Sequence, residues 1–147
     1  AICQTLDGID IYKYMKKNIF KSIGAVLLGF VAVVILSVTT DFIFETFGIF
    51  PGTVHPELYT SWMLCVALLY RSIFTVIGGY ITAKLAPQNP MRHVYILLIL
   101  GLIGGIAGAV SGWHLGNHWY PVLLTITGPA FVWVGGNLYK SKVSTVL

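Results

Sequence analysis

The stretch "LLYRSIFTVIGGY", residues 68–80, places a single arginine, Arg71, among residues that suit the interior of a lipid bilayer. The whole chain has 56% hydrophobic and only 10% charged residues. Soluble domains carry about 25% charged residues, so this composition indicates an integral membrane protein. Arg71 therefore needs a physical explanation, because an unpaired charge in hydrocarbon is costly.

Four apolar stretches are long enough to cross a hydrocarbon core of about 30 Å, which requires roughly 20 helical residues. They cover about residues 19–47, 58–85, 91–113 and 120–139. Helices fit these stretches better than barrel strands, because the apolar runs are continuous rather than alternating. We expect an all-α fold in which residues 19–147 form one transmembrane domain, an antiparallel up-down four-helix bundle.

The residues before the first span, 1–18, are expected to form a cytoplasmic N-terminal segment. Within it, "MKKNIF" from Met15 is typical of a natural start, so residues 1–14 are either native or an upstream extension. The apolar run that follows is longer than a signal-peptide core, and no A-x-A-like cleavage site comes after it. We therefore expect the first span to be retained.

The basic residues predict the orientation of the spans. Every Lys and Arg except Arg71 falls on one side if the helices alternate, whereas the loops at 48–57 and 114–120 contain none. By the positive-inside rule, both termini are expected to be cytoplasmic. The net charge of +4 is thus interpreted as a topology signal with some attraction to anionic lipid, and not as a nucleic-acid patch.

Arg71 lies roughly 20 Å above Lys84, the expected cytoplasmic boundary, because a helix rises about 1.5 Å per residue. A charge at that depth needs a partner. Asp41 and Glu45, one turn apart near the outer end of the first span, are the only carboxylates within any predicted span. Side chains lean towards the N-terminus of their own helix, so Arg71 and Asp41 on antiparallel neighbours point towards each other. We predict an Arg71–Asp41 ion pair, with Glu45 nearer to the outer water.

Polar side chains near this pair are expected to support it by hydrogen bonding: Ser37, Thr40, Tyr70 and Thr75. Two interpretations of the cluster stay open. It either fixes the register of two helices, as buried ion pairs do in some proteins, or it lines a polar cavity that accepts an anion, a headgroup or a proton.

Glycines form the next clear pattern. In "GLIGGIAGAVSG" of the third span, overlapping G-x-x-x-G spacings lie on one narrow arc, and Gly78 lies on the small-residue face of the second span. Small residues let membrane helices approach closely, so these glycines are predicted to pack helices either within one bundle or between copies of the chain. The predicted packing residues are Gly78, Gly101, Gly105, Gly108 and Gly112.

The second and fourth spans end alike, in "TVIGGYITAKL" and "VWVGGNLYKSK". Each has a Gly-Gly pair one or two turns before a cytoplasmic lysine. A duplicated helical hairpin would account for this similarity.

Candidate metal ligands are sparse. His114 and His118 have i, i+4 spacing and lie with His55 on the predicted outer side, but Gly116 and Asn117 interrupt the helical signal there. We predict no metal site and no cofactor. No catalytic motif or phosphate-binding loop is present in the sequence, so we do not expect an enzyme.

The stretches "SIGAVLLGFVAVVILSVTTDFIF" and "YRSIFTVIGGYITAKLAPQNPMRH", together with the glycine-rich third span, resemble a group of small, uncharacterised bacterial inner-membrane proteins with four spans. The resemblance covers roughly Met15 to the end of the chain. It implies a location in the bacterial inner membrane. It brings no activity and no ligand with it.

Two classes of function follow from these patterns. The first is a non-catalytic accessory protein or self-assembling bundle, whose partners are membrane lipid and either a second copy or a larger membrane complex. Its glycine arc and outer aromatic residues would make the contacts: Phe50, Tyr59, Trp62, Trp113 and Trp119. The alternative is a small transporter or channel that uses Arg71, Asp41 and Glu45 to recognise or relay charge.

Overall fold

The computed structural model describes residues 2–52, 55–113 and 117–146, and within these residues the chain is all-α. Four α-helices and one short 3-10 helix follow one another along the chain. Their bounds are α1 Ile2–Thr46, η1 Pro56–Leu58, α2 Ser61–Leu85, α3 Pro90–Ser111 and α4 Trp119–Val146. Each of the four α-helices is long and apolar enough to cross a membrane, which fits a multi-pass membrane protein.

The first helix extends farther towards the N-terminus than the sequence pattern predicts. Helix α1 begins at Ile2, so most of the expected N-terminal segment 1–18 is helical, although the part apolar enough to span a membrane begins only at Met15. Hydropathy marks where a helix enters lipid, not where it begins, and no proline interrupts this stretch. For the same reason α4 extends beyond residue 139 to Val146.

Local sequence signals explain where the other helices begin and end. After α1, Gly48 adopts a φ of 69°, a left-handed conformation that is common just after a helix and costs glycine little. Pro56–Leu58 forms a 3-10 turn, so α2 begins at Ser61 rather than at residue 58. Pro90 occupies the first turn of α3, where its missing N–H costs nothing.

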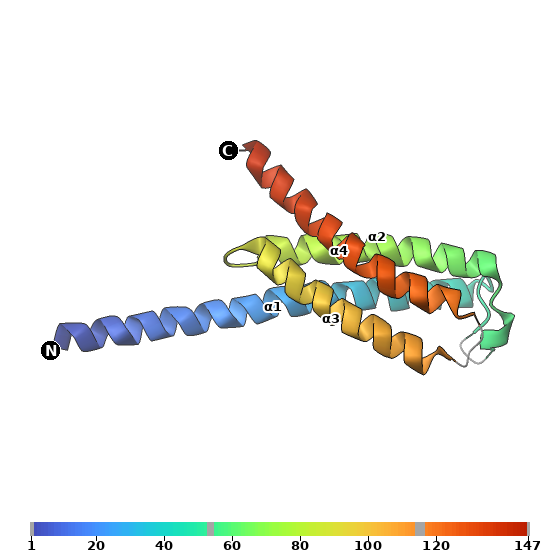
Figure 1. Ribbon diagram of the computed structural model, residues 1–147, viewed down its shortest axis with the longest axis horizontal. Helices are drawn as coiled ribbons and strands as arrows, with labels where there is room; N and C mark the ends of the chain where they lie inside the picture. Colours follow the sequence, from blue (N-terminus) through green and yellow to red (C-terminus); the bar gives the residue numbers. More distant parts are fainter. Residues whose placement is uncertain (1, 53–54, 114–116, 147) are drawn as a thin grey trace.

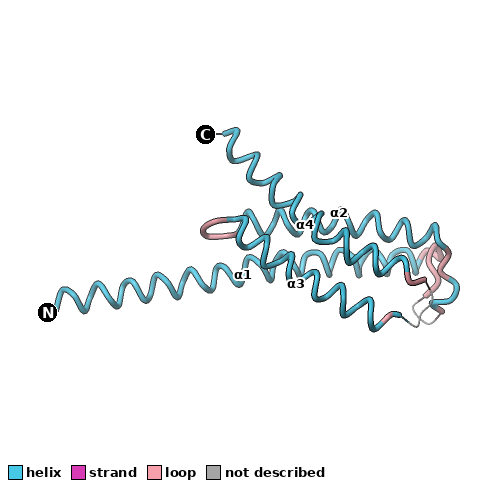
Figure 2. The backbone as a smooth tube through the Cα atoms, in the orientation of Figure 1, coloured by secondary structure: helices cyan, strands magenta, loops and turns pink. Residues whose placement is uncertain are grey.

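The helices lie side by side, with the α1–α2 and α3–α4 connections at one end of the bundle and the α2–α3 connection at the other (Figure 1). Helix α2 packs against both α1 and α4, and α4 also packs against α3. The tube in Figure 2 shows that the N-terminal part of α1 and the C-terminal part of α4 diverge from the bundle. We name the two ends by their connections, the 47–60 end and the 86–89 end.

Tight packing is concentrated towards the 86–89 end. A buried cluster joins all four helices there, and it consists of Val26, Ala83, Val94, Leu97 and Val132. Glycines let the backbones approach one another beside this cluster. A side chain at Gly78 would meet the backbone of Gly29, at 2.9 Å, and one at Gly79 would meet the carbonyl of Val132. This half of the bundle is therefore closed.

The glycines predicted to pack helices differ in what surrounds them. Gly78 faces α1, and a Cβ added at Gly105 would lie 3.0 Å from the Oγ1 atom of Thr125 on α4. Gly101 and Gly108 have nothing within 4 Å of such an added atom. Gly112 follows the last residue of α3, and its backbone N–H donates to the carbonyl of Gly108.

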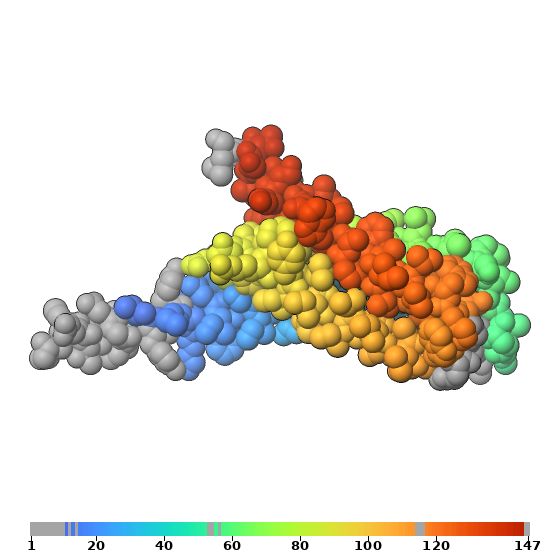
Figure 3. Space-filling view, in the orientation of Figure 1, coloured from blue at the N-terminus to red at the C-terminus, as the bar shows by residue number. Residues whose placement is uncertain are grey.

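Large apolar side chains cover much of the outer surface. Figure 3 shows the ends of α1 and α4 projecting from the rest of the bundle. Trp62 and Leu69 on α2 are exposed, and so are Ile103 and Val110 on α3. In water such a surface would be a liability, whereas acyl chains solvate it without cost. The exposed surface thus fits the membrane assignment of the four helices.

Candidate functional site

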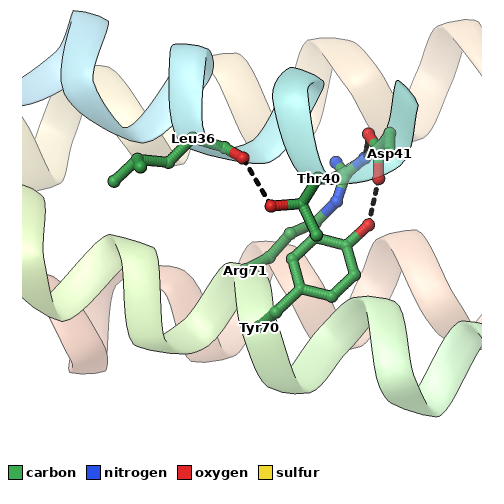
Figure 4. Close-up of polar contacts among 5 residues, drawn as sticks. All are labelled: Leu36, Thr40, Asp41, Tyr70 and Arg71. Atoms are coloured by element: carbon green, nitrogen blue, oxygen red, sulfur yellow. Dashed lines mark hydrogen bonds and ion pairs between the residues drawn. The ribbon is translucent and has the colours of Figure 1, made fainter. Parts of the chain in front are cut away.

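Arg71 and Asp41 face each other across the contact between α2 and α1 (Figure 4). The Nη2 atom of Arg71 donates a hydrogen bond to the Oδ2 atom of Asp41 at 2.6 Å. The hydroxyl group of Tyr70 donates to the other carboxylate oxygen of Asp41. Both oxygens of Asp41 are therefore occupied, and the structure brings together these three sequence-predicted residues.

The guanidinium group of Arg71 keeps unused hydrogen-bonding capacity. Its Nε atom is buried, yet it has no hydrogen-bond partner among the described residues. Arginine carries five N–H donors, and leaving a buried one unpaired is unfavourable. An unpaired buried donor is uncommon in native structures, and it adds to the cost of holding Arg71 at this position.

Glu45 lies one turn beyond Asp41 on α1 and remains outside the ion pair. Neither of the ion pairs among the described residues includes it, so no cationic nitrogen there comes within 4.0 Å of its carboxylate. The sequence placed Glu45 in one cluster with Arg71. The structure places it on the wall of a cavity that Arg71 also lines.

The cavity has a volume of about 530 Å³ and lies towards the 47–60 end. All four helices contribute to its wall, including Asp41 and Glu45 from α1, Arg71 from α2, Gly108 from α3 and Tyr120 from α4. Its volume is within the range of about 300–1,000 Å³ that is usual for small-molecule sites. The ion pair therefore borders open space rather than being sealed between two helices.

Aromatic contacts hold the connecting segment against the cavity. Phe50 is only 3% exposed, and its ring centroid lies 5.0 Å from that of Phe44 and 5.7 Å from that of Tyr59. Edge-to-face packing of this kind is favourable beyond the burial of apolar area. The Nδ2 atom of Asn117 donates to the carbonyl of Tyr59 at 3.2 Å, which ties the start of α4 to the same segment.

Three predicted supporting residues make no hydrogen bond to the guanidinium group in the structure. The Oγ1 atom of Thr40 donates to the carbonyl of Leu36 at 2.8 Å, and that of Thr75 donates to the carbonyl of Arg71 at 2.7 Å. Ser and Thr in helices commonly bond the carbonyl four residues earlier, which satisfies the hydroxyl locally. Ser37 is buried in α1. Among the four predicted supporters, Tyr70 is the one that contacts the ion pair.

Sequence reasoning missed two polar residues of the cavity wall, Tyr120 and Asn117, and assigned Phe50 and Tyr59 to outer contacts instead. All four lie in connecting segments or at a helix end. Their aromatic and polar character at a membrane boundary resembles ordinary interface anchoring. The signal that could have separated them is proximity to Asp41 and Glu45 in space, which depends on how the connecting segments fold back.

The electrostatic environment at the mouth of the cavity is negative. The pKa of Tyr59, which precedes α2, is raised above its ordinary value of 10.0, mainly by burial and then by the negative charges of Glu45 and Asp41. Arg71 opposes this shift and is the smallest of the four influences. The carboxylates therefore outweigh the guanidinium group at this position.

The histidines do not form a metal centre with other ligands in the described part of the chain. No group of three or more His, Cys, Asp or Glu side chains there could hold a metal ion. The Nδ1 atom of His55 lies 3.1 Å from Glu57, and the ring of His118 stacks on Trp113 at 4.4 Å. His114 lies outside the described residues.

Comparisons with protein-family models, curated proteins and solved structures found no match to this chain. The resemblance to small bacterial four-span proteins therefore stays a prediction.

Proposed function

We propose that this chain is a multi-pass membrane protein that binds a small polar ligand in the cavity at its 47–60 end. The observation that carries this proposal is the cavity of about 530 Å³, whose wall holds the Arg71–Asp41 ion pair together with Glu45, a carboxylate that has no cationic partner among the described residues. An ion pair that only fixed helix register would need no open space beside it. Charged side chains inside membrane segments typically mark ligand or ion pathways.

In this proposal the bundle is antiparallel, both termini are cytoplasmic and the membrane is the bacterial inner membrane. Lys84, Arg92 and Lys140 flank the 86–89 end, whereas the segments at the other end lack Lys and Arg. The cavity then opens towards the outer side. The glycine-packed half, with its buried valines, closes the route to the cytoplasm.

A closed inner half favours a carrier or a binding subunit over an open channel. A channel needs a continuous polar path, and the buried residues at the 86–89 end are mostly apolar. Transport would require the helices to separate there while the ligand occupies the outer cavity, as in alternating access. The contact of Gly78 with Gly29 is one of the contacts that would have to loosen.

A thiol-labelling experiment tests whether the cavity is open to outer water. In a variant in which Cys3 and Cys65 are replaced by serine, Gly108→Cys is expected to react with a membrane-impermeant methanethiosulfonate reagent added outside. Gly108 lines the cavity, and an added side chain there meets nothing within 4 Å. We expect labelling of Gly108→Cys to be about tenfold faster than that of Gly104→Cys.

Gly104 is the matched control, because it lies one turn away on α3, has open space around it and does not line the cavity. Equal labelling rates at the two positions, or no labelling at Gly108, would remove the support for an outer ligand site.

The second candidate function is self-assembly, and one observation favours it. Gly101, Gly104 and Gly108 on α3 have open space where a side chain would lie, so the monomer leaves part of the glycine arc without a neighbour. G-x-x-x-G spacing of this kind commonly carries contacts between membrane helices.

For this candidate we expect Gly104→Leu to reduce disulfide-independent crosslinking of copies in membranes about tenfold, with the monomer fold unchanged. Gly24→Leu on α1, which also has open space, is the control and should crosslink like the wild type. Undiminished crosslinking of Gly104→Leu would exclude this face of α3 as the contact.

A further inference from the structure

The ionisable side chains of the cavity leave one negative charge unbalanced. Asp41 and Arg71 neutralise each other at 2.6 Å, and Tyr70 occupies the second oxygen of Asp41. Glu45 lines the same space without a cationic partner among the described residues. A ligand that brings one positive charge would restore neutrality, whereas an anion would add to the imbalance.

Aromatic rings form much of the remaining wall. Phe42, Phe50, Tyr59 and Tyr120 all line the cavity. The face of an aromatic ring carries negative potential, so rings around a desolvated cation stabilise it, and proteins use such rings to recognise organic ammonium groups. Glu45 lies on α1 between Asp41 and the segment that carries Phe50, so a bound charge can contact both carboxylate and rings.

The donor set does not suit a divalent metal cation. Calcium and magnesium ions require about six or more oxygen ligands, and the described residues offer no group of three metal-binding side chains. The rest of the wall is apolar and includes Val38, Leu64 and Pro121. Such a wall contacts the hydrocarbon part of an organic molecule.

We propose that the cavity selects a monovalent ammonium group carried on an apolar or amphipathic molecule, with Glu45 as its counter-charge and the aromatic rings as its enclosure. This inference rests on the ligand-binding function proposed above. A free amine dissolved in the outer water and the headgroup of phosphatidylethanolamine both offer this chemistry.

The test measures binding of benzyltrimethylammonium to the purified full chain in a neutral maltoside detergent by equilibrium dialysis. Neopentylbenzene, which replaces the charged nitrogen by carbon, is the uncharged probe of the same shape. We expect the cation to bind to the wild type. Glu45→Gln should weaken binding of the cation about tenfold or more, with little change in binding of the uncharged probe.

Glu57→Gln is the matched control. Glu57 is an exposed carboxylate at the same end of the bundle, 3.1 Å from His55 and outside the cavity wall. The affinity of the Glu57→Gln variant for the cation should therefore stay within about twofold of the wild type. A second variant, Phe42→Leu, removes a ring at an exposed position, where a substitution by another apolar residue should change stability little. Its affinity for the cation should fall about threefold.

The failures of the two proposals are distinguishable. If Gly108→Cys is labelled but the cation does not bind, or Glu45→Gln and Glu57→Gln weaken it equally, ammonium selectivity is overturned and the outer site survives. Tighter binding of benzoate than of benzyltrimethylammonium, lost in Arg71→Met, would also overturn it. If Gly108→Cys is not labelled, the ligand site itself fails.

The source of the ammonium group is resolved in lipid nanodiscs. We compare binding of benzyltrimethylammonium in nanodiscs of phosphatidylethanolamine with binding in nanodiscs of a neutral glycolipid that has no ammonium group. A several-fold weaker affinity in phosphatidylethanolamine shows that the lipid headgroup occupies the cavity. Equal affinity in the two lipids, with the Glu45 dependence retained, assigns the site to a free amine.

Discussion

Replacing Arg71 by methionine is expected to lower the free energy of unfolding by about 2 to 4 kcal/mol, because it leaves the charge of Asp41 without a partner inside the membrane. The range lies below that of a fully buried pair, since the two side chains are 32% and 27% exposed. Asp41→Asn should lower the free energy of unfolding by a similar amount, because it leaves the positive charge of Arg71 without a partner. Unfolding of the purified chain in mixed micelles of maltoside and dodecyl sulfate measures each change.

The double variant Asp41→Asn/Arg71→Met separates the interaction from the individual side chains. Its loss in the free energy of unfolding should be clearly smaller than the sum of the losses in the two single variants, with a coupling energy of about 1 to 3 kcal/mol. Arg92→Met is the control, because Arg92 is exposed at the start of α3 and should change stability by no more than about 0.5 kcal/mol. Strict additivity of the two changes in the double variant would mean that the contact contributes no net stability.

The contact between Arg71 and Asp41 could be anticipated from sequence because three independent constraints converge on it. Bilayer thickness limits where the two residues lie in depth, antiparallel neighbours bring the helices together, and side chains lean along each helix in a fixed direction. Those constraints are properties of regular helices. They need no knowledge of how the connecting segments fold.

The cavity could not be anticipated in the same way. Its wall includes Phe50, Tyr59 and Asn117, which lie in connecting segments whose course depends on long-range contacts such as the bond from Asn117 to Tyr59. Periodicity carries no information about such segments. The same reasoning placed Glu45 in one cluster with the ion pair but nearer to the outer water, and it gave no sign of the cavity that Glu45 and Arg71 both line.

The glycine pattern was informative about packing but not about which glycines pack most tightly. The G-x-x-x-G arc of α3 drew attention because of its length, yet Gly101 and Gly108 within it have no close neighbour, whereas Gly105 faces Thr125. The closest approaches to the backbone of another helix involve the Gly-Gly pairs near the ends of α2 and α4. The spacing shows that one face of a helix carries small residues, but the geometry with which two helices cross decides whether another backbone reaches that face.

The two Gly-Gly pairs meet each other in a reciprocal way. A side chain at Gly79 would meet the carbonyl of Val132, and a side chain at Gly135 would meet the carbonyl of Val76. In each case the contacted residue lies three positions before the glycine of the other helix. Gly79 is the second glycine of its pair and Gly135 is the first, so the crossing is one residue out of the register in which the two hairpin ends look alike in sequence.

This crossing predicts that Gly79→Ala destabilises the protein by about 2 to 3 kcal/mol, although alanine favours a helix over glycine by about 1 kcal/mol. The added Cβ would overlap a backbone carbonyl, which cannot rotate away as a side chain can, so α2 and α4 would have to separate. Gly135→Ala should cost about the same, because its Cβ would meet the carbonyl of Val76. Unfolding in mixed micelles measures both changes.

Gly24→Ala is the matched control, since nothing lies within 4 Å of an added Cβ at Gly24. There the helix propensity acts alone, so stability should stay unchanged or rise by up to about 1 kcal/mol, opposite in sign to Gly79→Ala. The double variant Gly79→Ala/Gly135→Ala should lose less stability than the two single variants together. Once the first added Cβ has separated α2 and α4, the second Cβ finds room between them. If Gly79→Ala matched Gly24→Ala in sign, α2 and α4 would not approach as closely as their backbones do here.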